Sequence, residues 1–438
     1  MKNFYQLVLS VILMGQGVAQ EKKDSFSLPD AINYAVKNNY TAVNASSDLE
    51  AARHKKWETT TMGLPQIDAN VGYQNNFKIA TNLIEIGGQQ MTLQFGQYNS
   101  MDAKVTLNQL IFNGSYLVGL ESAKTYLKIS QNAKVKTEQE IREITTKAYG
   151  DVLLAEESIT IIERNKVILE KTLNDTKQIH KNGFIEEESV ERLQITLAEI
   201  NSGLDYAKRM KVIATNMLKL LMGIEVDNTI VLTDKLDTLA MNQIDLALLS
   251  DTFDVKNTID YQISNNVVES NRLLLKLEKS KALPTLGAQV NLGANTFDSR
   301  FTMFNGDQKW YNYSNLGVGL NIPLFSSFGR ASKTQQAKIA FEQAKTRLVE
   351  TEQKLKLQYQ KAKSDFEYSV AQYGNAKNTL QLSERIEKKQ QIKFKEGLST
   401  SFEFTEAQRQ LYTAQQSYLQ SMVEVITKRA ALEKIMTK

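Results

Sequence analysis

Residues 283–295 read Leu-Pro-Thr-Leu-Gly-Ala-Gln-Val-Asn-Leu-Gly-Ala-Asn, and every second residue after Pro284 is apolar. The residues between them are threonine, glycine, glutamine and asparagine, which carry no charge. An alternation with a period of two is typical of a β-strand with one apolar face. A strand of about 10 residues spans a bilayer when it is tilted. The stretch therefore predicts a membrane strand, with a half-buried strand of a soluble sheet as the alternative.

Similar alternation predicts four strands in all, over residues 66–79, 100–112, 285–297 and 312–325. The second of these is the least regular, and its pattern places Ile111 on the apolar face and Phe112 opposite. We expect the other face of the sheet to be uncharged and rich in Asn, Gln and Gly. Aromatic residues gather at the strand ends, as in the aromatic girdles of membrane strands: Phe77, Phe95, Tyr98, Phe112, Phe297, Phe301, Phe304, Trp310, Tyr311, Tyr313, Phe325 and Phe328.

Four strands are too few to close a barrel, and a sheet in lipid cannot leave an open edge. Each unpaired backbone group there costs several kcal/mol. We therefore expect the barrel to be shared between chains. Three chains would supply twelve strands, an even number inside the usual range.

The chain also repeats itself. Leu64-Pro65 and Leu283-Pro284 each precede a predicted strand, and Lys181-Asn182-Gly183-Phe184 corresponds to Lys395-Glu396-Gly397-Leu398 at nearly the same offset. We expect two copies of one unit. The predicted divisions are a signal peptide at 1–19, a first repeat at 20–222, a linker or equatorial region at 223–257, and a second repeat at 258–438.

Each repeat is expected to contain one long helix and shorter ones. No proline occurs between residues 66 and 283, as long uninterrupted helices require. Apolar residues in the second long segment recur at the gaps of a coiled-coil seam, among them Phe341, Ala344 and Leu348. The predicted long helices cover residues 115–182 and 331–395, and the shorter ones cover residues 41–62, 184–221, 258–282 and 398–436.

The first residues have the order of a secretory signal. Lys2 is followed by the apolar run from Leu7 to Met14, and then by the small residues Gly17-Val18-Ala19. This order is typical of a cleaved signal peptide, with an uncleaved anchor as the alternative. This apolar run is shorter than a membrane-spanning helix, which needs about 20 residues.

The composition argues against catalysis and against nucleic-acid binding. The 438 residues include no cysteine and only two histidines, and the formal net charge is +4 without a basic stripe. We find no nucleophile with a base, no phosphate-binding loop and no set of metal ligands. We therefore expect no enzyme, no cofactor, no metal site and no nucleic-acid partner.

In this order of motifs the sequence resembles the TolC-like outer-membrane efflux proteins, also called outer membrane factors. The resemblance covers essentially the whole mature chain. The residues that carry it are Leu28-Pro29-Asp30-Ala31-Ile32, Asn38-Asn39-Tyr40, the two Leu-Pro strand entries, Ile111-Phe112-Asn113-Gly114, Pro323-Leu324-Phe325 and the two Gly-containing helix turns.

The resemblance implies a mixed α/β membrane protein. Four strands per chain would complete a trimeric 12-stranded β-barrel in the outer membrane of a Gram-negative cell, above a long periplasmic coiled-coil barrel. Such a homotrimer is a passive export duct of a tripartite efflux or type I secretion system. Its partners would be a periplasmic adaptor (membrane fusion) protein, an inner-membrane pump of the RND or ABC type, and outer-membrane lipid.

The resemblance also places a periplasmic aperture at the second helix turn. Family members carry an aromatic residue before the turn glycine and two acids after it, and the matching positions here hold Phe394, Glu403 and Glu406. The family's gate arginine is replaced by Ser399. In the first repeat the acid position falls on Ser189, next to Glu187 and Glu188. The turns Gly183-Phe184 and Gly397-Leu398 would contact the adaptor.

Two interpretations of these acids stay open. Six carboxylates around a three-fold axis would select cations and raise one another's pKa. Alternatively, Thr400 to Glu403 is a helix capping box, and Glu187 and Glu188 are first-turn acids that the helix dipole favours. For the whole protein, the alternative to a duct is a coiled-coil scaffold of the periplasm or cell surface. The cargo stays open as well.

Overall fold

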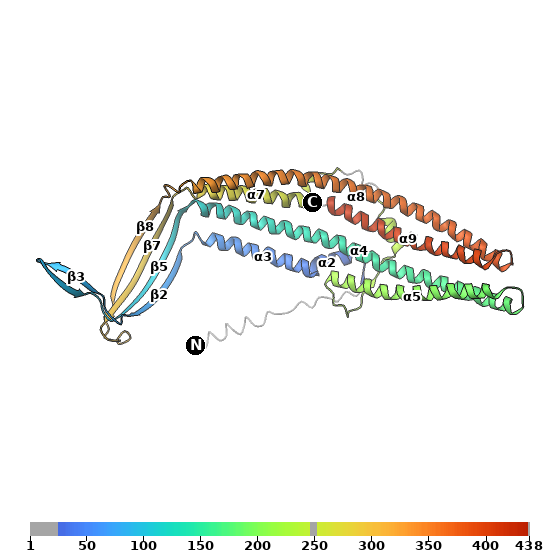
Figure 1. The fold of residues 1–438 in the computed structure, drawn as a ribbon, viewed down its shortest axis with the longest axis horizontal. Helices are drawn as coiled ribbons and strands as arrows, with labels where there is room; N and C mark the ends of the chain where they lie inside the picture. Colours follow the sequence, from blue (N-terminus) through green and yellow to red (C-terminus); the bar gives the residue numbers. More distant parts are fainter. Residues whose placement is uncertain (1–24, 246–251, 437–438) are drawn as a thin grey trace, which may run out of the picture. The chain divides into compact units, whose positions relative to one another are not determined.

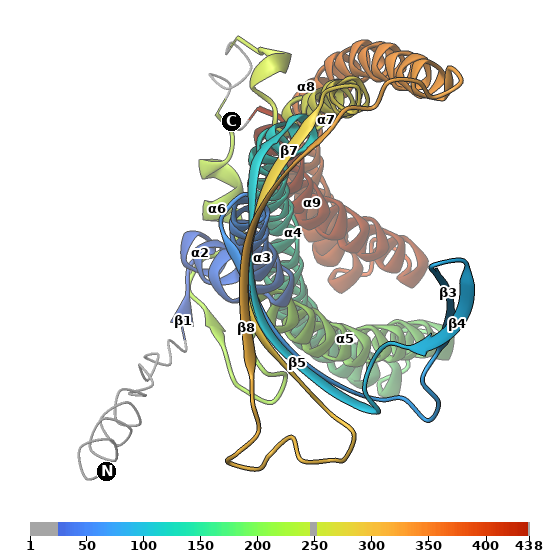
Figure 2. The same cartoon turned by 90° about the vertical axis from the view of Figure 1, so that its left-hand side faces the viewer.

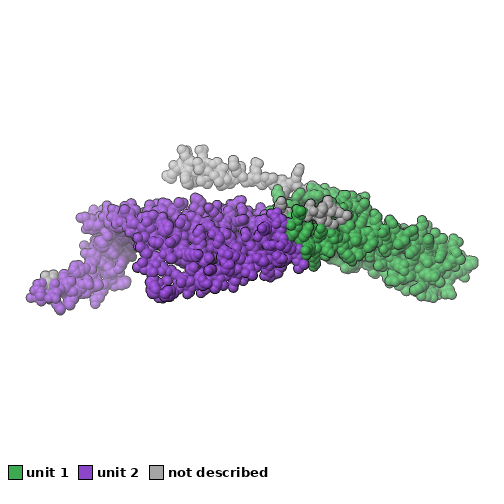
Figure 3. All heavy atoms as spheres, turned by 90° about the horizontal axis from the view of Figure 1, so that it is seen from above, with its two compact units in different colours: residues 1–43, 138–253, 358–436 green, residues 44–137, 254–357, 437–438 purple. Residues whose placement is uncertain are grey.

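The computed structural model describes residues 25–245 and 252–436, which form two compact units (Figure 3). One unit comprises residues 44–137 and 254–357, and we call it the strand unit. The other comprises, of the described residues, 25–43, 138–245, 252–253 and 358–436, and we call it the helical unit. The predicted signal peptide, residues 1–19, lies outside the described residues.

Helices dominate the chain, and the same order of elements occurs in both halves (Figure 1). Two helices are far longer than the rest: α4 has 68 residues and α8 has 67. Their bounds, and those of the shorter helices, are α2 Leu28–Asn38, α3 Tyr40–Thr61, α4 Gly114–Lys181, α5 Glu187–Met222, α6 Leu236–Asn242, α7 Ile259–Ser280, α8 Gly329–Lys395 and α9 Ser401–Met436, with a 3-10 turn η2 at Val255–Asn257. Within the described ranges, no helix has both the length and the apolar character needed to cross a membrane.

The strand unit contains a four-stranded sheet in the order β2-β5-β7-β8, in which all neighbours are antiparallel (Figure 1). Figure 2 shows β5, β7 and β8 curving together. The strands are β2 Gln66–Asn75, β5 Asn99–Asn113, β7 Thr285–Asp298 and β8 Tyr311–Asn321. Strands β2 and β8 form its two edges. Helix α4 begins directly after β5, whereas residues 322–328 separate β8 from the start of α8.

The register separates two faces. Residues of the apolar face are largely exposed, including Ile67 at 66%, Leu316 at 69% and Val318 at 64%. The other face, which we call the polar face, pairs Asn108 with Gln289 and Thr106 with Asn291. Because a soluble sheet covers its apolar side, these exposures identify a surface that needs an apolar environment.

Three expectations about the strands were wrong. A β-bulge between Leu110 and Phe112 shifts the register, so Phe112 and not Ile111 lies beside Leu286 on the apolar face. The polar face is not free of charge, because Asp68, Asp102 and Lys104 all lie on it by register. Tyr313 lies on the polar face as well, paired with Gly293, and not in a girdle at a strand end.

The segment between the first two sheet strands contains a hairpin that the sequence analysis did not predict. Strands β3 Thr81–Ile86 and β4 Gln89–Gln94 are antiparallel, and Gly87 and Gly88 form the turn with φ of 62° and 83°. Two consecutive residues with positive φ make the type I′ turn that favours hairpins. The predicted strands 66–79 and 312–325 end earlier, at Asn75 and Asn321.

The helical unit has a core between its long helices, built around Tyr149, Phe366 and Met422. The short strands β1 Ser25–Phe26 and β6 Val231–Leu232 pair in parallel beside it. Asp234 accepts a hydrogen bond from Leu28 N at 2.7 Å and lies 2.8 Å from Tyr149 Oη. The region 223–257, predicted as a linker, therefore carries β6, α6 and η2, and its first part anchors the N-terminal segment to α4.

Candidate functional site

Two helix turns at one end of the helical unit have the same geometry. The α4–α5 turn has Gly183 at φ 77°, and the α8–α9 turn has Gly397 at φ 70°. In both, the glycine N–H donates to the carbonyl three residues back and the next N–H donates to the carbonyl five back, at 2.8–3.2 Å. This is the Schellman motif, which favours glycine because L side chains crowd the left-handed conformation.

The residue after each turn glycine is apolar and exposed. Phe184 is 82% exposed and Leu398 is 78% exposed. Helices α5 and α9 then begin only at Glu187 and Ser401, three residues later than predicted, because a short non-helical segment follows each Schellman turn. Each hairpin therefore presents one apolar side chain at its tip.

Glu403 closes a capping box at the start of α9. Its carboxylate accepts hydrogen bonds from Thr400 N at 2.9 Å and from Ser399 Oγ at 2.8 Å, while Glu403 N donates to Thr400 Oγ1. These bonds, the Thr400 N–H first, hold the pKa of Glu403 below its ordinary value. The capping interpretation of Glu403 is therefore observed in this chain, and Ser399 is one of its donors.

The second acid, Glu406, is paired with a base. Arg409 donates two hydrogen bonds to its carboxylate, at 2.7 and 2.9 Å, and the pKa of Glu406 is lowered by this arginine. Glu188 on α5 is paired in the same way with Arg192, at 2.9 Å from Nε. Within one chain the pKa values of Glu403 and Glu406 are both lowered, whereas six crowded carboxylates would raise them.

Phe394 lies inside the tip. Its ring is 6% exposed and stacks on Phe404, with ring centroids 5.2 Å apart and an angle of 7° between the planes. The two rings belong to a small core formed by α4, α5, α8 and α9, which is completed by Leu169, Leu173, Val190, Leu193 and Ile200. Phe394 therefore supports the tip and does not form an exposed ring at its end.

A groove of about 370 Å³ lies between α5 and α9 next to this core. Its walls carry both signs of charge, with Arg192 and Glu199 on α5 and Glu406 and Arg409 on α9. The guanidinium of Arg192 also lies 5.7 Å from the centre of the Phe402 ring. Two of the tip acids, Glu188 and Glu406, are thus each paired with an arginine of the same chain.

The polar face of the sheet forms a second set of ordered polar contacts, in the strand unit. Thr106 Oγ1 donates to Asn291 Oδ1 at 2.8 Å, and Asn291 Nδ2 donates to Asn315 Oδ1 at 2.9 Å. This ladder crosses β5, β7 and β8 at one level of the sheet. Such a face suits water, because its amides and hydroxyls exchange hydrogen bonds with it.

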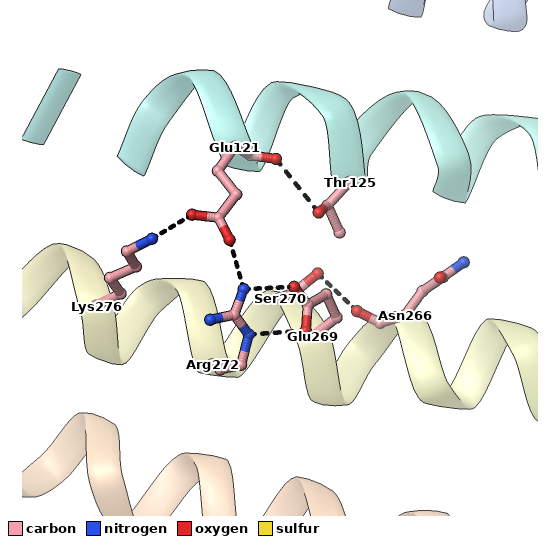
Figure 4. Close-up of polar contacts among 7 residues, drawn as sticks. All are labelled: Glu121, Thr125, Asn266, Glu269, Ser270, Arg272 and Lys276. Atoms are coloured by element: carbon pink, nitrogen blue, oxygen red, sulfur yellow. Dashed lines mark hydrogen bonds and ion pairs between the residues drawn. The ribbon is translucent and has the colours of Figure 1, made fainter. Parts of the chain in front are cut away.

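Four charged residues join α4 to α7 in the same unit (Figure 4). Glu121 accepts hydrogen bonds from Arg272 at 2.6 Å and from Lys276 at 2.5 Å, and Arg272 also binds Glu269. Lys276 first, and then Arg272, lower the pKa of Glu121. The network fixes how α7 lies on α4 below the sheet.

The arginines that pair with Glu188 and Glu406, and the Glu121 network, were not predicted from the sequence. The spacing of Glu188 and Arg192, four apart on one helix, could have indicated the first pair. No local pattern indicates the contact of Glu121 with Arg272, because these residues are far apart in the sequence. Ser189, which occupies the acid position of the first repeat, is half-buried, and its N–H donates to Glu186 O.

Comparisons with known proteins agree on one group. A family model described as outer membrane efflux protein matches residues 268–437. The Outer membrane protein TolC of Vibrio cholerae serotype O1 is 23% identical over 319 residues, which make up 72% of this chain and 68% of TolC.

Solved structures show the same fold. The transmembrane channel CusC has a TM-score of 0.76 at 14% identity, with 97% of this chain and 95% of CusC covered. The outer membrane protein VceC of Vibrio cholerae has a TM-score of 0.73 at 14% identity, with coverage of 93% and 95%. The match extends over nearly the whole chain, strand unit and helical unit included.

Proposed function

We propose that this chain, a TolC-like outer-membrane efflux protein, forms a trimeric duct through the outer membrane of a Gram-negative cell, with its helices in the periplasm. The observation that carries the trimer is the sheet. It has an exposed apolar face, a hydrogen-bonded polar face and two edges, β2 and β8. Three copies close a 12-stranded barrel in which lipid covers the apolar face and water fills the polar side.

Strand direction supports closure between copies. Because every neighbouring pair in the order β2-β5-β7-β8 is antiparallel, β2 and β8 run in opposite directions. The β8 edge of one copy can therefore pair with the β2 edge of the next without breaking the antiparallel pattern. Each added copy satisfies backbone groups that cost several kcal/mol when unpaired in lipid.

The duct is passive in this proposal. Its relatives are channel proteins, and the chain offers no phosphate-binding loop to use nucleotide energy. A periplasmic adaptor protein and an inner-membrane pump, of the RND or ABC type, would deliver the cargo. Exposed Phe184 and Leu398, next to Gly183 and Gly397 at the two hairpin tips, support an adaptor contact there.

The aperture would lie at this same tip and open when the partner binds. Glu403, Glu406, Glu187, Glu188 and Ser189 would line it, and Phe394 would hold its shape from the core beneath. Separating the charges from Arg192 and Arg409 upon opening would expose acids that attract cations. The alternative, a coiled-coil scaffold without a channel, leaves the exposed apolar face of the sheet without a role.

Single-channel conductance in planar bilayers tests the duct and its aperture. The purified protein should form stable, cation-selective pores, and the double substitution Glu403→Gln/Glu406→Gln should reduce that selectivity. Glu350→Gln is the matched control, because Glu350 is also ion-paired within one helix, with Lys354 at 2.6 Å, but lies in the strand unit. Selectivity equal in the double variant and the control would leave Glu403 as a helix cap and Glu406 as an ion pair within α9. The absence of any pore would contradict the duct.

A further inference from the structure

Every glycine within the four-stranded sheet lies on the polar face by register. These residues are Gly72, Gly287, Gly293, Gly317 and Gly319. At four of them an added Cβ would meet no atom closer than 3.7 Å. At Gly293 it would come within 2.5 Å of Tyr313 Cζ and 2.6 Å of Tyr313 Oη. Gly293 is thus the one of these five whose bare backbone is covered by an aromatic ring.

The ring comes from the neighbouring strand. Tyr313 on β8 pairs directly with Gly293 on β7, so its side chain must lean over the glycine to bring the ring there. Beyond Gly293, the hydroxyl of Tyr313 donates a hydrogen bond to Asp102 Oδ2 on β5 at 2.8 Å. The side chain therefore lies across three strands, fixed at its far end.

Two features of the sheet hold the ring of Tyr313 close to its surface. The missing Cβ of Gly293 leaves room under the ring, and the carboxylate of Asp102 holds the hydroxyl. On β5, the strand on the other side of β7, Lys104 pairs with Gly293. The ring of Tyr313 therefore has two charged neighbours on β5, Lys104 and Asp102. If one of these two features is lost, Tyr313 adopts another staggered rotamer, in which its ring points away from the sheet.

We propose that Gly293 and Asp102 hold the Tyr313 ring flat on the polar face, and that this position sets the aperture of the barrel. The inference rests on the proposed duct, in which the polar face lines the lumen. Three copies of Tyr313 would then lie at one level around the lumen. A released ring would project into the passage, so this level acts as a size-determining ring within the barrel, separate from the aperture at the helical tips.

The test uses the full-length trimer, whose natural chain has no cysteine. The single substitution Gln289→Cys places one thiol on the polar face, closer to the helical end of the sheet than Gly293. A thiol reagent added from the outer side must then pass the level of Tyr313. We would measure its reaction rate for a small reagent and for a bulky one, together with single-channel conductance.

Gly293→Ala in this background should slow the bulky reagent several-fold and leave the small one nearly unchanged. Its control is Gly319→Ala, which lies on the same face with no atom within 4 Å of its added Cβ. Adding Tyr313→Ala to Gly293→Ala should restore the rate, since no ring remains. Tyr313→Phe, which keeps the aromatic ring but loses the hydroxyl that binds Asp102, should also slow the bulky reagent.

The outcomes separate this inference from the proposed function. Rates for the bulky reagent that are equal in Gly293→Ala, Tyr313→Phe and Gly319→Ala would overturn the role of Tyr313 while the duct stands. If Gly293→Ala fails to assemble trimers, Tyr313→Phe alone decides, since it adds no atom to the sheet. A parent protein whose thiol stays unreactive from the outer side, and which forms no pore, would instead contradict the duct itself.

Discussion

The ring of Phe394 lies nearly parallel to the ring of Phe404, with centroids 5.2 Å apart, next to the turn between α8 and α9. One ring ends α8 and the other begins α9, so the stack joins the two helices on either side of the Gly397 turn. Both rings are buried, at 6% and 0% exposed. The hairpin tip is therefore a packed structure and not a loosely held loop.

Truncating the buried ring should loosen the tip. Phe404→Ala removes a fully buried aromatic side chain, which typically costs about 3–5 kcal/mol. Hydrogen exchange of the backbone amides in residues 390–410 should accelerate strongly, with little change in the strand unit. Phe402→Ala is the control, since Phe402 is 60% exposed and its contact with Arg192 contributes about 0.5–1 kcal/mol. Equal acceleration in the two variants would refute the role of the stack.

Alanine at the turn glycine should destabilise the second hairpin. Gly397 has φ 70°, and an L residue in that conformation costs about 1–2 kcal/mol. Gly374→Ala should have the opposite effect, a gain of about 0.5–1 kcal/mol, because Gly374 lies within α8 with open space around it. The melting temperatures of the two variants, measured as trimers in detergent, would be compared. A lower melting temperature for Gly374→Ala than for Gly397→Ala would contradict the turn assignment.

Acid should weaken the start of α9. Because the pKa of Glu403 in the folded chain is lower than its ordinary value of 4.5, its bonds contribute fully at pH above that value. The contribution is lost as the pH falls through the lowered pKa. The first turn of α9 should therefore open equally often from pH 7 to 5 and more often below about pH 4. Hydrogen exchange of its backbone amides would measure this opening.

The substitution Glu403→Gln is the check on this pH dependence. It should remove the added opening at low pH, because a neutral amide does not titrate. Glu406 has a lowered pKa of its own, from Arg409, and therefore Glu406→Gln serves as the comparison. Unchanged acid behaviour in Glu403→Gln would show that another group controls this helix start.

A charge on the apolar face of the sheet should prevent assembly. Val318→Arg places a guanidinium where we expect lipid, which costs about 2–4 kcal/mol near the bilayer centre. Gly319→Arg, the adjacent residue on the polar face, should be tolerated because it faces water. The fraction of trimer in unheated detergent gels measures the effect. Equal loss of trimer in the two variants would contradict the assignment of the two faces.

Periodicity was sufficient to find the strands and the long helices, because both repeat a local geometry over many residues. It failed at Leu110 and Phe112, where one extra residue in β5 reverses the alternation, and the effect depends on the partner strand β7. The hairpin of β3 and β4 was not predicted, although Gly87-Gly88, between the predicted strands 66–79 and 100–112, is a known turn signal.

The candidate site was predictable only in part. Turn glycines and the capping box are local, and both are found in the structure. The burial of Phe394 depends on Phe404 and on α4 and α5, which no local pattern relates to it. The contact of Tyr313 with Asp102 likewise joins strands from different halves of the chain, so register had to be known first.

Crosslinking between copies tests the shared barrel most directly. In the cysteine-free chain, Val71→Cys on the β2 edge would be combined with cysteine at Ser314, Leu316, Val318 or Leu320 on the β8 edge, all on the apolar face. Oxidation in outer-membrane vesicles should yield a covalent trimer, and no larger species, for one of these pairs. Val71→Cys combined with cysteine at Gly317, on the polar face, should not crosslink. Chains that stay monomeric in all pairs, or that form ladders beyond three, would contradict the trimeric duct.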